Sequence, residues 1–233
     1  EGYTPLRDCL KADLTAKGLK SDSDDLIIMS GAQQGIDLSA QIFCNTGDVI
    51  LCEDPSFIGS LNAFRSHGIN LVGIPMEDDG LDLGALEKAM KEHANAKLLY
   101  VIPNFQNPSG ISTSWEKRRK IYELAKQYGI VILEDNPYGD LRFSGEDIPS
   151  IKSLDRDGLV IYCGSFSKLI APGIRVGYLL ADAELTAKLT VAKQASDVHT
   201  NLLAQILVHE FISTCNLPAH IEKMQSLYRH KYT

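Results

Sequence analysis

Four polar segments of this sequence carry the side chains that could do chemistry. Each follows a short apolar run, and they lie at 30–35, 104–110, 136–141 and 164–178. If the apolar runs are parallel strands, these segments meet at the carboxyl edge of one sheet, where α/β proteins bind ligands. The sequence therefore predicts one composite ligand site.

The segment 164–178 concentrates the reactive groups. It contains two hydroxyls, an amine and a guanidinium, on Ser165, Ser167, Lys168 and Arg175. Hydroxyl and guanidinium groups can bind a phosphate. An amine that is partly desolvated beside another cation has a lowered pKa and can attack an aldehyde. By spacing alone, a solvated surface loop remains an equal alternative.

The glycine-containing turn at 30–35 suits a phosphate. Gly31, Ala32 and Gln33 lead from an apolar run into a helical pattern, so their backbone N–H groups lie at the positive end of a helix dipole. Such junctions are common, and a tight structural turn is the alternative interpretation.

Asp135 follows the apolar run IVIL and stands next to Glu134. Because side chains alternate along a strand, only one of these carboxyls should face the site. A carboxylate at a buried strand end usually forms a cap or a salt bridge, but it can also hold a proton on a heterocyclic nitrogen. Asn107 and Tyr138 add hydrogen-bonding groups at neighbouring strand ends.

The hydrophobic pattern predicts the scaffold that positions these groups. Seven short apolar runs alternate with helical patterns at 33–45, 56–67, 82–94 and 113–128. The runs lie at 26–29, 49–52, 71–74, 98–102, 130–133, 159–163 and 176–181. This alternation is typical of a mostly parallel sheet covered on both faces. We therefore expect an α/β fold, a three-layer αβα domain with a mostly parallel seven-stranded sheet.

Local signals predict where the helices begin and end. Thr4 is expected to cap a helix at the start of the chain. Thr113 or Ser114 should cap the helix that Gly129 ends. From about 183 to 213 the pattern is helical throughout.

Composition argues against several kinds of partner. The formal net charge of −7 gives no general attraction to nucleic acid or to an anionic membrane. No apolar run approaches the roughly 20 residues that span a bilayer, and the first residues lack a signal-peptide pattern, so we expect a cytoplasmic protein. The five cysteines and six histidines are scattered, so we propose no metal site.

Three motifs occur together in a fixed order: N-P-S-G at 107–110, D-N-P-Y at 135–138, and S-F-S-K with R-V-G-Y within 165–178. This combination resembles the fold-type I enzymes that depend on pyridoxal 5′-phosphate (PLP), specifically class I/II aminotransferases of the branch similar to aminoadipate and kynurenine aminotransferases. The resemblance covers residues 1–233. It implies transfer of an amino group between an amino acid and a 2-keto acid, in a homodimer.

The resemblance implies a role for each site residue. Lys168 would join covalently to PLP and shuttle the substrate proton, with Asp135 and Tyr138 as the other catalytic residues. Asp135 would pair with the protonated ring nitrogen, Asn107 and Tyr138 with the phenolic oxygen. Phe57 would stack on the ring, where many relatives have Tyr. The phosphate would be held at Gly31, by the backbone of Ala32 and by the side chains of Gln33, Ser165, Ser167 and Arg175.

The resemblance also implies that important parts lie elsewhere. After Pro218 a helical pattern reaches Thr233 without a stop signal. We therefore expect residues 1–233 to be a PLP-binding large domain truncated at both ends, without the small domain whose arginine binds the substrate carboxylate. Such a piece should be inactive. The stretch 196–201 is expected to approach the partner's cofactor.

Three alternatives remain open. Ser109, Tyr122 and Lys126 reproduce the spacing of a short-chain dehydrogenase, although the turn at 30–35 lacks that family's third glycine. A PLP-binding effector domain of a transcription regulator would carry the same motifs beside an upstream winged helix. A PLP-dependent β-lyase on the same scaffold is the third.

Overall fold

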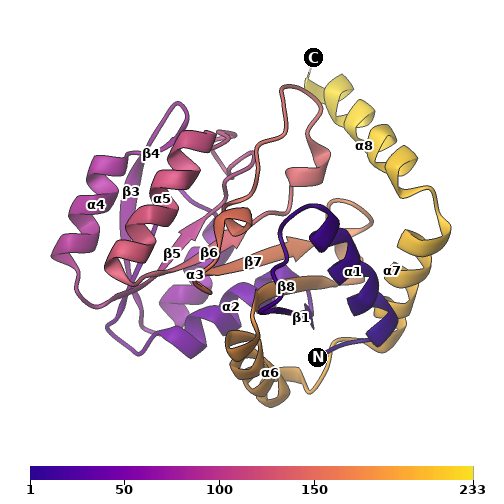
Figure 1. Ribbon diagram of the computed structural model, residues 1–233, viewed down its shortest axis with the longest axis horizontal. Coiled ribbons are helices and arrows are strands. Elements are labelled where there is room, and N and C mark those ends of the chain that lie inside the picture. The colour runs from indigo at the N-terminus through magenta and orange to yellow at the C-terminus, as the bar shows by residue number, and fades with distance from the viewer. Residues whose placement is uncertain (233) are drawn as a thin grey trace.

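The computed structural model describes residues 1–232, and within them eight strands form one sheet in the order β1-β8-β7-β6-β5-β2-β3-β4 (Figure 1). Only β8 and β4 run against the other strands. The strands are β1 (Asp24–Met29), β2 (Val49–Asp54), β3 (Asn70–Glu77), β4 (Gly80–Leu81), β5 (Ala96–Val101), β6 (Val131–Asp135), β7 (Val160–Ser165) and β8 (Gly177–Asp182).

Seven of these strands lie where the apolar runs predict them, and the mostly parallel sheet is confirmed. The expected number of seven is short by one. The additional strand, β4, has two residues, Gly80 and Leu81, which pair with Glu77 and Met76 after a tight turn. Two residues are too few to produce an alternating pattern in the sequence. Thr233 lies outside the described residues.

Eight α-helices and three short 3₁₀ helices connect the strands in the described part of the chain. The α-helices are α1 (Thr4–Ala16), α2 (Ala32–Phe43), α3 (Ile58–Ser66), α4 (Leu83–Glu92), α5 (Trp115–Tyr128), α6 (Ala183–Asp197), α7 (Leu202–Thr214) and α8 (Leu217–Tyr232). The 3₁₀ helices are η1 (Gly139–Leu141), η2 (Ile151–Leu154) and η3 (Pro172–Ile174).

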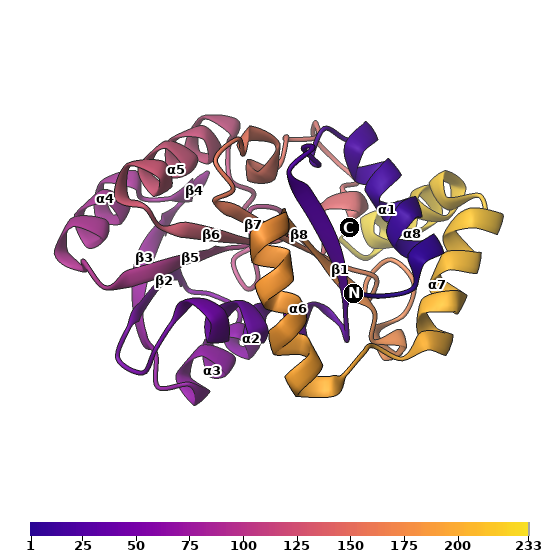
Figure 2. The ribbon, with the colours of Figure 1, turned by 60° about the horizontal axis from the view of Figure 1, so that its bottom comes forward.

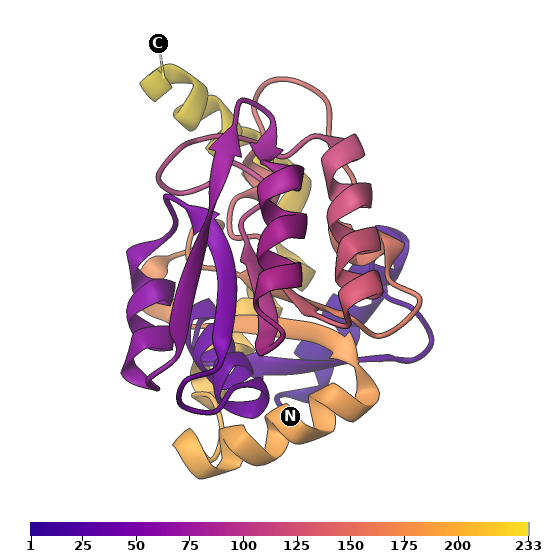
Figure 3. The ribbon, with the colours of Figure 1, turned by 90° about the vertical axis from the view of Figure 1, so that its left-hand side faces the viewer.

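The helices cover both faces of the sheet. Helices α2, α3 and α6 pack on one face, and α4 and α5 on the other (Figures 2 and 3). Helices α1 and α7 extend the second layer over β1 and β8. Along β1, Ile27 and Met29 belong to the first layer's core and Leu26 and Ile28 to the second's. Strand alternation therefore supplies both cores of the predicted three-layer fold.

The helix ends show which local signals hold. Ser114 Oγ accepts a hydrogen bond from Lys117 N at 3.3 Å, and Gly129 ends α5 in the left-handed conformation at φ 67°. At the start of the chain the expected cap is wrong. Tyr3 occupies the N-cap position and Thr4 is already helical, with Pro5 in the first turn, where its missing N–H costs no helical hydrogen bond.

The expected single helical stretch at 183–213 is two helices. Residues 198–201 separate α6 from α7, with Val198 at φ 63° and Asn201 as the N-cap of α7. The Asn201 side chain accepts a hydrogen bond from Ala204 N at 2.9 Å. Asparagine is favoured at the N-cap over the helix interior, so Asn201 was the available signal, which the helical pattern on both sides of the break concealed.

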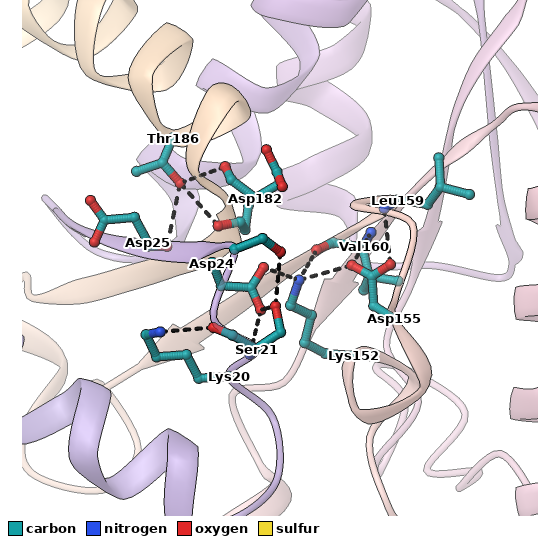
Figure 4. Close-up of polar contacts among 12 residues, drawn as sticks. Lys20, Ser21, Asp24, Asp25, Lys152, Asp155, Leu159, Val160, Asp182 and Thr186 are labelled. Atoms are coloured by element: carbon teal, nitrogen blue, oxygen red, sulfur yellow. Dashed lines mark hydrogen bonds and ion pairs between the residues drawn. The ribbon is translucent and has the colours of Figure 1, made fainter.

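A buried ion cluster holds together the edge of the sheet opposite the polar segments (Figure 4). Lys152 Nζ lies 2.8 Å from Asp24 Oδ1, 2.9 Å from Asp155 Oδ2 and 3.0 Å from the Val160 carbonyl. All three charged side chains are 3% exposed or less. The cluster ties the starts of β1 and β7 to η2.

Candidate functional site

A cavity of about 170 Å³ lies at the carboxyl ends of the parallel strands. Nine of its twelve lining residues are site residues predicted from the sequence; Ile36, Ile102 and Pro137 are not. The nine lie at the ends of β6 and β7 or in the segments that follow β1, β2, β5, β6 and β7, and they are Ala32, Gln33, Phe57, Asn107, Asp135, Tyr138, Ser165, Ser167 and Lys168.

The two remaining predicted residues, Gly31 and Arg175, lie against each other beside this cavity. Gly31 has φ 82°, and a Cβ atom at this position would overlap the Arg175 guanidinium. That guanidinium donates from Nη1 to Ser167 Oγ at 3.3 Å. Only glycine permits both the backbone conformation and this close approach.

The start of α2 presents hydrogen-bond donors to the same place. Among the described residues, the N–H groups of Ala32 and Gln33 have no backbone acceptor, as expected for the first turn of a helix. Together with Arg175 and the hydroxyls of Ser165 and Ser167 they make an anion cradle. The Gln33 side chain donates to the Gly59 carbonyl at 3.0 Å instead of reaching this cradle.

Asp135 ends β6 and faces the cavity, whereas Glu134 points to the other face of the sheet, as strand alternation predicts. Glu134 accepts hydrogen bonds from Ser150 Oγ and from the backbone N–H groups of Ile151 and Lys152. Asp135 is 4% exposed, and its Oδ1 is buried without any partner. Burial raises the pKa of Asp135 to about 7, against the opposing effect of a hydrogen bond from Tyr100.

Sequence reasoning missed a hydroxyl chain behind Asp135. The Ser60 hydroxyl donates to Tyr100 Oη at 2.8 Å, and Tyr100 Oη donates to Asp135 Oδ2 at 2.9 Å. Tyr100 belongs to an apolar run and reads as a core residue. The available signal was side-chain alternation. Tyr100 precedes Ile102, which lines the cavity, by two residues, and side chains two residues apart in extended backbone point to the same face.

A second missed pair supports the segment that carries Asn107. Gln106 Nε2 donates to Glu53 Oε2 at 3.0 Å and to the Pro55 carbonyl at 2.7 Å, while its Oε1 accepts from Ser109 N at 2.9 Å. Glu53 is 1% exposed, and burial raises its pKa to about 8. A carboxyl that directly follows the apolar run VILC was the available signal.

Lys168 is exposed and lines both this cavity and a neighbouring apolar hollow. Tyr138 is shared in the same way. Burial raises the pKa of Tyr138, while its hydrogen bond with the Asn107 side chain acts in the opposite direction. The hollow has a volume of about 330 Å³, and its other lining residues are Phe105, Leu141, Phe143 and Tyr228.

The spacing that suggests a dehydrogenase does not form a site. Tyr122 Oη and Lys126 Nζ both bind Asp157, at 2.8 and 2.9 Å. Ser109 Oγ instead donates to Gln106 Oε1 at 2.6 Å. Tyr122 and Lys126 therefore share a structural contact with Asp157, and Ser109 serves a different one.

The assembled site combines an exposed amine, a buried carboxyl with one free oxygen, and an anion cradle. Within residues 1–232, no three His, Cys, Asp or Glu side chains gather as they would around a metal ion. No helix in that range has both the length and the apolar character to cross a bilayer. The arrangement suits a flat, phosphorylated aldehyde with a basic ring nitrogen.

Proteins similar to this chain in sequence include an aminotransferase and a transcriptional regulator. The family described as aminotransferase class I and II matches residues 2–231. An aromatic-amino-acid aminotransferase of Thermococcus litoralis is 38% identical over 98% of this chain and 56% of its own length. An uncharacterized HTH-type transcriptional regulator of Bacillus subtilis, YisV, is 33% identical over 95% of this chain and 46% of its own length.

Solved structures share this fold. A Pyrococcus horikoshii kynurenine aminotransferase in complex with PMP superposes with a TM-score of 0.94 and 36% identity, over 98% of this chain and 57% of that one. The chain spans about half the length of the curated relatives it matches.

Proposed function

Since this chain belongs to the class I and II aminotransferases, we propose that it performs PLP-dependent transfer of an amino group between an amino acid and a 2-keto acid. The observation that carries the proposal is the pairing, in one cavity, of the Lys168 amine with the buried, unpartnered Oδ1 of Asp135. A buried acceptor without a partner is costly unless a ligand satisfies it.

The residues present fit PLP. The free Asp135 oxygen matches a protonated pyridine nitrogen, and the apolar side chains of Ile36, Ile102 and Phe57 suit the faces of a flat ring. The cradle at Gly31 and Arg175 matches a phosphate. PLP supplies an aldehyde and an electron-withdrawing ring when it is bound.

This chain's own residues would then position and move protons. The Lys168 amine would hold the cofactor and, when free, would be the base that removes the proton from the substrate α-carbon. Asp135 Oδ1 would accept a hydrogen bond from the ring nitrogen and favour its protonated form. Asn107 and Tyr138 are placed to hydrogen-bond the phenolic oxygen.

Borohydride reduction of the PLP-loaded, full-length protein tests the assignment. Reduction should attach the cofactor irreversibly to the peptide that contains Lys168, as detected by mass spectrometry, and a Lys168→Ala protein should not be labelled. Lys126→Ala is the matched control, because Lys126 pairs with Asp157 away from the cavity. Equal labelling of the Lys168→Ala protein would refute the assignment.

We also propose that the amino-acid substrate carries an apolar or aromatic side chain. The hollow that shares Lys168 and Tyr138 with the cavity is walled by Phe105, Phe143 and Tyr228, and such walls favour apolar groups. Comparing kcat/KM for phenylalanine and aspartate tests this. A preference for aspartate would contradict it.

A second copy of this chain is the proposed partner. Four large side chains between 198 and 207 are at least half exposed: Val198 at 70%, Leu202 at 50%, Leu203 at 66% and Leu207 at 52%. Contiguous exposed apolar side chains of this kind mark interaction surfaces. The surface starts beside the cradle, because Ser30 Oγ donates to Asp197 Oδ2 at 2.6 Å, so a homodimer would place the partner near the cavity.

We further propose a cytoplasmic location. The five cysteines are free thiols in the structure, and free thiols persist where the compartment is reducing. Fractionation of the source cells with an antibody to the protein would test this, and recovery outside the cytoplasm would contradict it.

A PLP-binding regulator is the second candidate, and the similarity to YisV favours it. The site would then bind the cofactor and report on an amino acid instead of turning it over. Two measurements on the full-length protein separate the candidates: steady-state production of a 2-keto acid, and binding to DNA. Turnover without DNA binding supports the enzyme, and the reverse supports the regulator.

A further inference from the structure

We propose that Tyr100 is the positioning residue of the site: its hydroxyl, oriented by Ser60, fixes the Asp135 carboxyl so that Oδ1 faces the cavity. This inference rests on the proposed function, in which Oδ1 meets the ring nitrogen. Tyr100 itself does not line the cavity, so it would act through Asp135 alone.

The direction of the hydrogen bonds follows from the donors available. A phenol has one proton to donate. Because the Ser60 hydroxyl donates to Tyr100 Oη at 2.8 Å, the phenolic proton is free to be donated to Asp135 Oδ2 at 2.9 Å. Oδ2 is therefore the occupied oxygen, and Oδ1 is the one left without a partner.

Packing holds the phenol in place. Tyr100 is 0% exposed in the middle of the sheet, on β5 between β2 and β6. Its ring meets Phe64 edge to face, with centroids 5.5 Å apart. Ser60 and Phe64 are both fully buried and lie one turn apart on α3, so one helix face supplies both the hydroxyl and the ring contact. The hydroxyl cannot move without disturbing the core.

The hydrogen bond from Tyr100, whose hydroxyl is oriented by Ser60, also favours the ionised form of Asp135. Tyr100 is the donor that lowers the pKa of this carboxyl, against burial, which raises it to about 7. The other titratable groups near Asp135 do not replace the Tyr100 hydrogen bond in lowering the pKa of this carboxyl. Glu53 and Cys163 are both buried, with raised pKa values, and Tyr138 lies at the cavity. Lys168 is the cation lining the cavity within the described residues.

Loss of the Tyr100 hydroxyl would leave Asp135 with two unsatisfied oxygens. The carboxyl could then take up a proton, or turn Oδ1 away from the cavity, and either change removes the acceptor that a protonated ring requires. The rest of the cavity wall would stay as it is. Binding of a ring-protonated ligand should therefore weaken, although no residue that touches the ligand has changed.

Equilibrium binding of pyridoxamine 5′-phosphate tests this without depending on turnover. In the full-length protein, Tyr100→Phe should weaken binding roughly tenfold or more, since a hydrogen bond to a charged group is stronger than one between neutral groups. Ser60→Ala should weaken it less, in the same direction. Tyr178→Phe is the matched control, a buried tyrosine on β8 whose hydroxyl is not bonded to Asp135, and it should bind as the unmodified protein does.

A double-mutant cycle shows whether Tyr100 acts through Asp135. In an Asp135→Asn background, Tyr100→Phe should change the dissociation constant by less than about twofold, because the carboxylate that it stabilises is gone. An unchanged tenfold effect in that background would show a merely structural role and overturn the inference. In the Asp135-containing protein, the acid limb of the binding profile should also move to higher pH in Tyr100→Phe.

The outcomes separate this inference from the proposed function. If the unmodified protein fails to bind the ligand, the proposed function fails. If it binds, and both Tyr100→Phe and Ser60→Ala bind equally well, only the positioning role is refuted. Should Tyr100→Phe not fold, Ser60→Ala keeps the phenol in the core and decides the question through the same binding profile and the same cycle with Asp135→Asn.

Discussion

At the Asp135 carboxyl, one oxygen accepts a hydrogen bond from Tyr100 and the other faces the cavity with none. Two equivalent atoms thus have different environments, and the difference is imposed from behind by a core residue. At Gly31 a single atom is also decisive, because the absence of a Cβ makes room for the Arg175 guanidinium. Both features concern single atoms, and single substitutions can test them.

Gly31→Ala should damage the anion cradle. The new methyl group would overlap the Arg175 guanidinium, at a backbone φ of 82° that alanine tolerates poorly. We expect PLP binding to weaken at least about tenfold and unfolding stability to fall by about 1–3 kcal/mol. The measurements are PLP titration and urea denaturation. Gly173→Ala, in the connection that carries Arg175 but with open space around it, is the control, and an equal loss there would contradict the interpretation.

The buried carboxyls predict the pH dependence of the cofactor-free protein. Burial raises the pKa of Asp135 to about 7 and that of Glu53 to about 8. The unfolded chain loses these protons near pH 4, so the folded state holds more protons between that pH and 7 to 8. Stability should therefore fall, by roughly a few kcal/mol, as the pH rises through this window.

Urea denaturation of the cofactor-free protein from about pH 5 to 8 measures this slope. Asp135→Asn combined with Glu53→Gln should flatten it, because neither amide titrates. A slope that persists in the double variant would assign the dependence to other groups.

At the scale of elements, the reversed strand β8 explains how one connection supplies so much of the site. Because β7 and β8 are antiparallel, with Ser165 opposite Gly177, the segment between them starts and ends at the same edge of the sheet. Ser165, Ser167 and Arg175 thus return to one place although the first and the last are ten positions apart in the sequence. A parallel neighbour would have carried the chain to the opposite edge.

The buried ion cluster fixes the other ends of β1 and β7. Lys152→Met should lower unfolding stability by about 3–5 kcal/mol, since Asp24 and Asp155 would be left as uncompensated buried charges. Urea denaturation measures the change. Lys126→Met, which removes an exposed pair with Asp157, should cost less than about 1 kcal/mol. Equal losses in the two variants would show that the cluster contributes nothing special.

At the scale of the whole molecule, the apolar side chains at 198–207 lie on the outside of α7 and of the loop before it, where residues 1–232 leave at least half of each one exposed. Asp197, the last residue of α6, accepts a hydrogen bond from Ser30 Oγ, next to the cradle. The surface and the cavity are therefore neighbours, and a second copy on the surface would lie beside the site.

Leu203→Asp should dissociate the proposed homodimer, because it places a charge at the centre of the apolar surface. Analytical ultracentrifugation of the full-length protein should show a shift from dimer to monomer, with weaker PLP retention. Leu227→Asp on α8 is the control for adding a charge at an exposed leucine. An unchanged dimer in Leu203→Asp would move the interface elsewhere.

The sequence by itself determined seven of the eight strands, the loops that follow them and eight of the residues that line the cavity, whereas Phe57 was indicated by the family resemblance alone. The reason is physical: buried strands require apolar runs, and polar groups at the carboxyl ends of parallel strands must meet at one edge. Alternation along β6 also required that only one of Asp135 and Glu134 face the site, and Glu134 is the one that points to the other face of the sheet.

Only the tertiary structure decided which groups stand behind the site. Tyr100, Ser60 and Glu53 lie far in the sequence from their hydrogen-bond partners, on separate strands and on a helix. Each of the three lies in or beside an apolar stretch of sequence, so its polar role is not apparent from the pattern. A hydrogen bond between such groups depends on how the layers pack, which hydrophobic periodicity does not encode. The two-residue strand β4 and the break before α7 were missed for a related reason, because each is set by a few residues whose local preferences permit more than one conformation.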